Sequence, residues 1–323
     1  MSREKKKKSN HFLIRILSWL VSLACFTYLY WRISSQAPEN TSVLVYLSEI
    51  FASVNWIMWL GIMIPYSFFY LLVDTAVLWR TINWFNAKAP YSSLLPIRAS
   101  AYIISIINEQ IGKGTMALYL NKRYGVAGWE LGSTMLFIMF CEFFYLLIWA
   151  LIGVLIAWEF VPTIFHQIPL IAIFSFLFLT AFIWVFRSKL FKSSSILHHP
   201  LLKAFRESPV GFYATVMLIR SPALIAAVWV YSMSASLFGV EIPFSTMLGF
   251  LPIIFFGALI PGPFRAVAVT LWPILFPENI GTMSVFGFVQ HNFFLLFNAT
   301  IGLVFLKKVN DTLFGEKDSP IAD

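Results

Sequence analysis

The chain has 323 residues, of which 59% are apolar and only 12% are charged, and its mean hydropathy is +0.79. A composition this apolar excludes an ordinary soluble domain and indicates an integral membrane protein. The formal net charge of +8 does not indicate nucleic-acid binding, because the basic residues lie in short blocks between apolar runs, where membrane topology explains them. The two cysteines, Cys25 and Cys141, lie inside apolar runs, so neither a disulfide framework nor a thiolate metal site is expected.

Six apolar runs are long enough to cross a membrane, because about 20 helical residues span the hydrocarbon core. The first run follows the basic residues Arg3 and Lys5–Lys8 and looks like a signal peptide. No small-x-small cleavage site follows it, so we expect an uncleaved helix. The six expected spans are 12–31, 54–79, 130–158, 168–186, 211–239 and 282–306.

Two further apolar stretches, 94–107 and 244–260, are interrupted by residues that break helices. Irregular backbone at membrane depth is tolerated only where protein or a watery cavity satisfies its polar groups. We therefore expect each interruption to be the tip of a re-entrant helical hairpin. The expected tip residues are Asn108, Gly112, Gly114, Pro261, Gly262 and Pro263.

The basic residues predict the orientation of the chain. If the N-terminus is cytoplasmic and both hairpins return to the side they entered, nearly all Lys and Arg face the cytoplasm, as the positive-inside rule requires. The hairpins then enter from opposite sides, so 94–158 and 244–306 form inverted repeats, which are typical of transporters. The expected fold is all-α: a polytopic helical membrane protein with six full spans and two re-entrant hairpins. Residues 1–310 form one integral membrane domain, and 311–323 form a polar cytoplasmic tail.

The order of these features resembles a known family. The segments are Asn108 to Gly114, Tyr124-Gly125-Val126, the span with Glu142, and Ile260-Pro261-Gly262-Pro263. Over about residues 10 to 310 this order resembles the transmembrane, flippase-like domain of lysylphosphatidylglycerol synthases and their stand-alone relatives. The chain departs from the family pattern at both tips, where it has Lys113 and Arg265 instead of acidic residues. The resemblance implies a lipid translocator that lacks the aminoacyl-transferase domain.

Three cations fall inside apolar segments, where a charge costs roughly 3 kcal/mol on insertion scales. They are Lys113 and Arg265 at the two tips and Arg220 in the span 211–239. Each is a candidate for binding a lipid phosphate through charge-assisted hydrogen bonds. The alternatives are pairing with an embedded carboxylate or extension of the long side chain to the headgroups.

Polar residues in the same segments are candidates for lining a transport cavity. Glu109 and Glu142 either relay protons or pair with embedded cations. His291 and Asn292, with Gln290, either line the cavity or bond neighbouring helices.

Other polar groups indicate structure rather than function. Asp74 precedes Arg80 by about one and a half helical turns, so we expect the two to pair at the interface. The pair His198-His199 has no second ligand pair at metal spacing, so no metal site is expected. No catalytic motif or dinucleotide fingerprint is present, so neither an enzyme nor a cofactor is expected.

Together these features predict a translocator of a polar or anionic lipid headgroup, through a cavity between the two hairpins. It would lie in the bacterial cytoplasmic membrane with both termini inside, and its partners would be anionic membrane lipids and not nucleic acid. Two alternatives remain open. One is an ion-coupled carrier of a small anionic solute, and the other is a non-catalytic subunit that presents lipid to a separate transferase.

Overall fold

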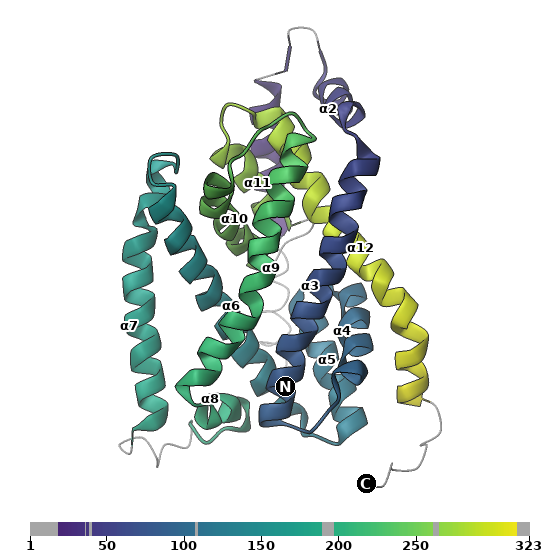
Figure 1. Ribbon diagram of the computed structural model, residues 1–323, viewed down its shortest axis with the longest axis vertical. Helices are drawn as coiled ribbons and strands as arrows, with labels where there is room; N and C mark the ends of the chain where they lie inside the picture. The colour runs from purple at the N-terminus through teal and green to yellow at the C-terminus, as the bar shows by residue number, and fades with distance from the viewer. Residues whose placement is uncertain are drawn as a thin grey trace, which may run out of the picture. The chain divides into compact units, whose positions relative to one another are not determined.

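The computed structural model describes residues 19–35, 37–38, 41–106, 109–188, 197–260 and 265–314. Throughout these residues the regular structure is helical, and no strand occurs among them (Figure 1). The chain is therefore all-α, as its composition predicts. Helices suit a chain this apolar, because every backbone group inside a helix finds its partner within the same segment, which the interior of a membrane requires.

Five helices of the described chain are long and apolar enough to cross a membrane, and they confirm five of the six expected spans. They are α3 (Trp56–Phe85), α6 (Gly128–Ile156), α7 (Ile168–Arg187), α9 (Val210–Ser236) and α12 (Ile280–Phe314). The sixth expected span, 12–31, starts outside the described residues and is helical over 19–34. The remaining short elements outside the hairpins are α2 (Val43–Ser53), η1 (Thr163–Gln167), η3 (Pro200–Leu202) and α8 (Lys203–Glu207).

The two interrupted stretches each form a pair of short helices. α4 (Tyr91–Ser105) packs against α5 (Glu109–Tyr124), and α10 (Phe244–Leu259) packs against α11 (Ala266–Leu275) (Figure 1). At about 1.5 Å per residue, each of these helices is too short to cross roughly 30 Å of hydrocarbon. The interruptions are thus confirmed as breaks between paired short helices, and their return to the side of entry stays a prediction.

The first break lies earlier than expected, because α5 already begins at Glu109. Gly112 and Gly114 are therefore helical residues and not tip residues, while Asn108 lies outside the described residues. Close packing explains this, since a Cβ on Gly112 would clash with the Ser105 hydroxyl and lie 3.0 Å from the Ala101 carbonyl oxygen. Glycine at this position lets α5 approach the α4 backbone, which outweighs its low helix propensity.

At the second break, α10 ends and α11 begins on either side of the expected tip. Pro261, Gly262 and Pro263 themselves lie outside the described residues.

The contacts of the chain divide it into two compact units, each with one short-helix pair. Unit 1 comprises 1–66, 143–176 and 223–294 and includes α10 and α11, and unit 2 comprises 67–142, 177–222 and 295–323 and includes α4 and α5. Each of the five long helices contributes residues to both units. The inverted repeat of 94–158 and 244–306 stays a prediction.

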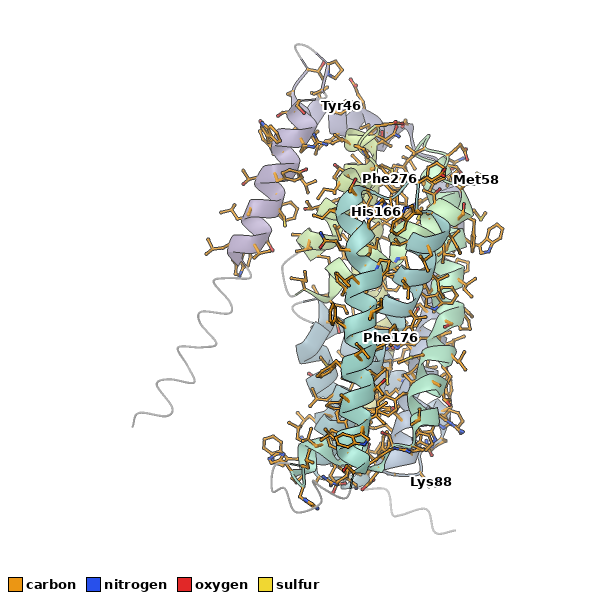
Figure 2. The ribbon with its side chains drawn as sticks, turned by 90° about the vertical axis from the view of Figure 1, so that its left-hand side faces the viewer. Tyr46, Met58, Lys88, His166, Phe176 and Phe276 are labelled. Carbon is orange, nitrogen blue, oxygen red and sulfur yellow. The ribbon has the colours of Figure 1, made fainter. Side chains whose placement is uncertain are left out.

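Aromatic side chains form the core of unit 1. Trp272 of α11 is fully buried, stacks on Tyr231 and meets the edge of Phe286 at a centroid distance of 4.8 Å. Tyr46, Met58, His166 and Phe276 lie toward one end of this unit, away from Phe176 (Figure 2). Helix ends from distant parts of the sequence therefore share one end of the unit.

Unit 2 has an apolar core built from α3, α4, α5, α6, α8 and α9, in which Leu94, Leu120, Leu131 and Val216 are fully buried. It also holds most of the basic residues whose side chains are described. In unit 1 the described basic side chains are those of Arg32 and Arg265. Among the residues with described side chains, the basic groups are therefore unevenly divided between the units.

Candidate functional site: a buried charge network

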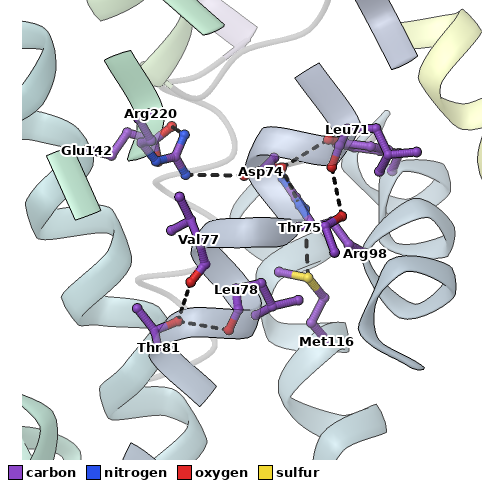
Figure 3. A network of polar contacts seen from close by, with 11 residues as sticks. Leu71, Asp74, Thr75, Val77, Leu78, Thr81, Arg98, Met116, Glu142 and Arg220 are labelled. Carbon is purple, nitrogen blue, oxygen red and sulfur yellow. Dashed lines mark hydrogen bonds and ion pairs between the residues drawn. The ribbon is translucent and has the colours of Figure 1, made fainter. Parts of the chain in front are cut away.

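Four charged side chains from four helices meet inside unit 2 (Figure 3). They are Asp74 of α3, Arg98 of α4, Glu142 of α6 and Arg220 of α9, and each has between 4% and 8% of its surface exposed. Asp74 and Arg220 lie about three turns from the nearer ends of their helices, and Glu142 lies near the middle of α6. The network therefore lies deep within the helices.

Asp74 is the central acceptor of the network. Its Oδ2 accepts hydrogen bonds from Arg98 Nε and from the Tyr102 hydroxyl, the latter at 2.9 Å, and Arg98 Nη2 also pairs with this oxygen. Its Oδ1 accepts from Arg220 Nη2 at 3.2 Å. The Arg98 guanidinium also lies over the Tyr102 ring, 4.5 Å from its centroid, and donates to Met116 Sδ at 3.7 Å. One carboxylate thus binds two guanidinium groups.

Arg220 extends the network to a second carboxylate. Its Nη1 donates to Glu142 Oε1 at 3.3 Å, while its Nη2 stays on Asp74. The order of the chain of contacts is Arg98, Asp74, Arg220, Glu142. With both carboxylates ionised, the two positive and two negative charges cancel, which removes much of the cost of burying them.

A small cavity adjoins the network, with about 10 Å³ accessible to a water-sized sphere. Asp74, Arg98 and Arg220 line it together with the apolar side chains Val77, Leu78, Met116, Met135 and Ile138. This space is close to the least that holds one water molecule. In this arrangement the carboxylates therefore occupy the guanidinium groups, and an anion as large as a phosphate would have to displace one of them.

Two of the candidate residues identified from the sequence belong to this network. Glu142 pairs with the embedded cation Arg220, and a role of Glu142 in proton relay stays a prediction. The extension of Arg220 to the headgroups is wrong, because its side chain is only 7% exposed and is held by Asp74 and Glu142.

The expected pair of Asp74 with Arg80 is also wrong. Asp74 binds Arg98 and Arg220, whereas Arg80 is exposed and lies over the Trp84 ring, 5.2 Å from its centroid. Residues six apart on a helix are rotated by about 120°, and only those three or four apart face each other.

Arg98 is not among the three embedded cations expected from the sequence. Its position inside the stretch 94–107 was a usable signal, because it lies about two turns from the start of α4. Its partner Asp74 also lies inside an apolar run, 54–79, but the contact between the two was not predictable, since contacts between separate helices are not visible in a hydropathy pattern.

Three polar candidates, Gln290, His291 and Asn292, lie in unit 1, and the first two bond neighbouring helices. His291 Nε2 accepts from Trp272 Nε1 at 3.1 Å, which joins α12 to α11. Gln290 Oε1 accepts from Trp59 Nε1 at 3.1 Å, which joins α12 to α3. Asn292 donates to the Phe288 carbonyl of its own helix at 2.8 Å. These contacts favour the structural alternative for this group.

The tip cations are described only in part. Arg265 begins α11 in the left-handed conformation, with φ 49°, the one positive φ among the described residues other than glycine. The side chains of Lys113 and Glu109 lie outside the described residues, so their proposed roles stay predictions.

Among the residues that the structure describes, no three His, Cys, Asp or Glu side chains are placed to hold a metal ion. Comparisons of the chain with protein families, with curated proteins and with solved structures find no match.

Proposed function

We propose that the protein is a membrane transporter that moves an anionic lipid headgroup across the bilayer while the acyl chains stay in the lipid. The observation that carries this proposal is the burial of two arginines around the Asp74 carboxylate: Arg220 and Asp74 belong to helices long enough to span a membrane, and Arg98 belongs to the short helix α4 packed beside them. The class of ligand follows from the guanidinium groups, because their planar donors match phosphate oxygens in pairs.

Stability alone is a poor reason for this network. Replacing a buried ion pair by well-packed apolar residues is often neutral or stabilising. Where helices only need to pack together, buried ions therefore add a desolvation cost without a clear gain in stability. Ionisable residues inside membrane segments instead mark substrate or ion pathways as a rule. Arg98 and Arg220 would bind the phosphate, with Asp74 and Glu142 as the counter-ions that hold the two cations between transport events.

The orientation that we propose follows from the basic residues. Lys88, Lys122, Arg123, Arg187, Lys203 and Arg206 all belong to unit 2, near helix ends or in connecting segments. By the positive-inside rule these segments face the cytoplasm, which also makes both termini cytoplasmic in a bacterial inner membrane. The two short-helix pairs would then be re-entrant and enter from opposite sides.

The proposed family follows from the resemblance alone: a stand-alone relative of the transmembrane domain of lysylphosphatidylglycerol synthases. Its partners would be anionic lipids and, as the source of a modified headgroup, a separate lipid-modifying transferase. At the tips, Lys113 and Arg265 would receive the headgroup on its way to or from the bilayer surface.

A reconstitution experiment tests this function. Purified protein in liposomes should move a fluorescent phosphatidylglycerol between leaflets, measured by the fraction that an impermeant quencher reaches. Arg98→Gln and Arg220→Gln should each slow this movement at least about tenfold, because a hydrogen bond to a charged group contributes roughly 1.5–3 kcal/mol. Arg80→Gln is the matched control, since Arg80 is exposed on the same helix as Asp74.

The outcomes separate the proposal from its alternatives. Equal rates in the wild type and both buried-arginine variants would contradict the phosphate site. One competing function is an ion-coupled carrier of a small anion. Uptake of radiolabelled inorganic phosphate into the liposomes, without movement of the lipid, would establish that carrier instead.

A further inference from the structure

We propose that Glu142 takes up one proton each time an anionic headgroup binds at Arg220, so that transport of each negative charge is coupled to one proton. This inference rests on the proposed function and adds its energy source. It comes from the composition of the network, in which two guanidinium groups and two carboxylates already balance.

Charge balance requires such a partner ion. A phosphodiester headgroup carries one negative charge, so its entry would leave the ionised network with a net charge of −1. An uncompensated charge is costly in a buried site, and each of the four side chains of the network is at most 8% exposed. Protonation of one carboxylate restores neutrality. The proton converts a carboxylate to a carboxylic acid, and the phosphate takes over the contact with the guanidinium group.

The geometry assigns this proton to Glu142 and not to Asp74. Asp74 binds both Arg98 and Arg220 and accepts from Tyr102, so its protonation would remove the counter-ion that two cations share. Glu142 contacts Arg220 through Nη1, on the side away from Asp74. Protonation of Glu142 would therefore release one edge of the guanidinium group while Asp74 still holds the other.

The groups around Glu142 are consistent with this exchange. Arg220 of α9 faces it directly, Asp74 of α3 lies across Arg220, and the Cys141 thiol of its own helix interacts with it electrostatically. Arg98 and Tyr102 of α4 act on it through Asp74. The cavity touches Arg220 but not Glu142 and has room for about one water molecule, so a phosphate oxygen that binds Arg220 Nη1 must take the place of the Glu142 carboxylate.

The experiment measures lipid and protons in the same liposomes. The lumen contains a pH-sensitive dye, the outer leaflet contains fluorescent phosphatidylglycerol, and a pH difference of one unit is imposed. We expect one proton to enter for each lipid moved, and the lipid to accumulate about tenfold in the leaflet on the alkaline side, because one pH unit is a tenfold ratio of protons. In the Glu142→Gln variant, lipid movement should not be accompanied by proton entry, and the distribution of lipid between the leaflets should not depend on the pH difference.

Glu130→Gln is the matched control, because Glu130 is on the same helix and pairs with Lys203 at a half-exposed site. This variant should keep the wild-type coupling. Thermal unfolding in detergent shows whether Glu142→Gln is folded. If it is not, the ratio of protons to lipid measured on the wild type still tests the coupling.

Each result is decisive. Lipid movement by the wild type without protons, and without response to the pH difference, would overturn the coupling and leave the proposed function intact. Unchanged coupling in a folded Glu142→Gln variant would overturn the role of Glu142. Absence of any lipid movement by the wild type would overturn both the function and this inference.

Discussion

Removal of the Asp74 carboxylate is the most direct perturbation of the buried network. Asp74→Asn keeps the size of the side chain but leaves Arg98 and Arg220 without the negative charge that they share. The side chains of all three residues are at most 7% exposed and the cavity beside them has room for only about one water molecule, so bulk water cannot solvate the two arginines in place of the lost carboxylate. Breaking a buried ion pair from one side costs about 3–5 kcal/mol, and we expect a loss of stability of this size.

The reactivity of the Cys141 thiol measures this loss of stability, because the thiol is fully buried in the folded chain and becomes accessible on unfolding. In a Cys25→Ser background, a thiol-reactive dye that fluoresces on reaction reports the unfolding of unit 2 as the temperature rises. Glu130→Gln is again the control, since its partner Lys203 is 25% exposed and such a pair contributes only about 0–1 kcal/mol. Asp74→Asn should therefore unfold at a much lower temperature than the control.

The double variant Asp74→Asn/Arg98→Gln tests the cause. It removes one positive charge together with one negative charge, so the remaining pair of Arg220 and Glu142 is balanced, and part of the lost stability should return. A single variant no less stable than Glu130→Gln, or a double variant that loses the sum of the two single effects, would refute the charge-network argument.

Three further predictions concern other parts of the chain. Gly153→Ala should lower the free energy of unfolding by about 1–3 kcal/mol, because the added Cβ would clash with the Leu248 carbonyl of α10. The control Gly61→Ala has open space around the added Cβ and should be neutral or stabilising, and thermal unfolding compares the two variants. Arg265→Gly should raise the free energy of unfolding by about 1 kcal/mol, because glycine adopts positive φ without strain. Slower lipid transport in this variant would show that the strained arginine has a function. An impermeant thiol reagent applied outside whole cells should label a cysteine at Gln167 but not one at Lys88, and the reverse pattern would contradict the proposed orientation.

The long helices were predictable because the length of an apolar run can be read from the sequence without knowing which segments contact each other. The apolar runs 54–79, 130–158 and 211–239 are long enough to span a membrane by composition alone, and the structure has helices there, which begin at Trp56, Gly128 and Val210. The break near Asn108 was misplaced for a related reason. Gly112 favours a turn when only local propensity counts, and its packing against Ser105 is a tertiary effect that the local sequence does not reveal.

The site was predictable only as a set of separate residues. Arg220 and Glu142 stood out because each is a charge inside an apolar run. Their contact joins positions 78 residues apart, and the contact of Arg220 with Asp74 joins positions 146 residues apart. A hydropathy pattern contains no information on which faces of different helices meet, so Asp74 was assigned to the nearest cation in sequence, Arg80.

The contrast between the two units strengthens the functional interpretation of the charges. In unit 1 the buried Gln290 and His291 join helices through hydrogen bonds from the indoles of Trp59 and Trp272, and these contacts are formed without any ionised partner. Neutral bonds of this kind are enough to hold membrane helices together. Unit 2 instead buries Arg98 and Arg220 with their carboxylates, at a much higher desolvation cost. Because the same chain joins other helices by neutral hydrogen bonds, the buried ions of unit 2 support the proposal that this unit binds a charged ligand.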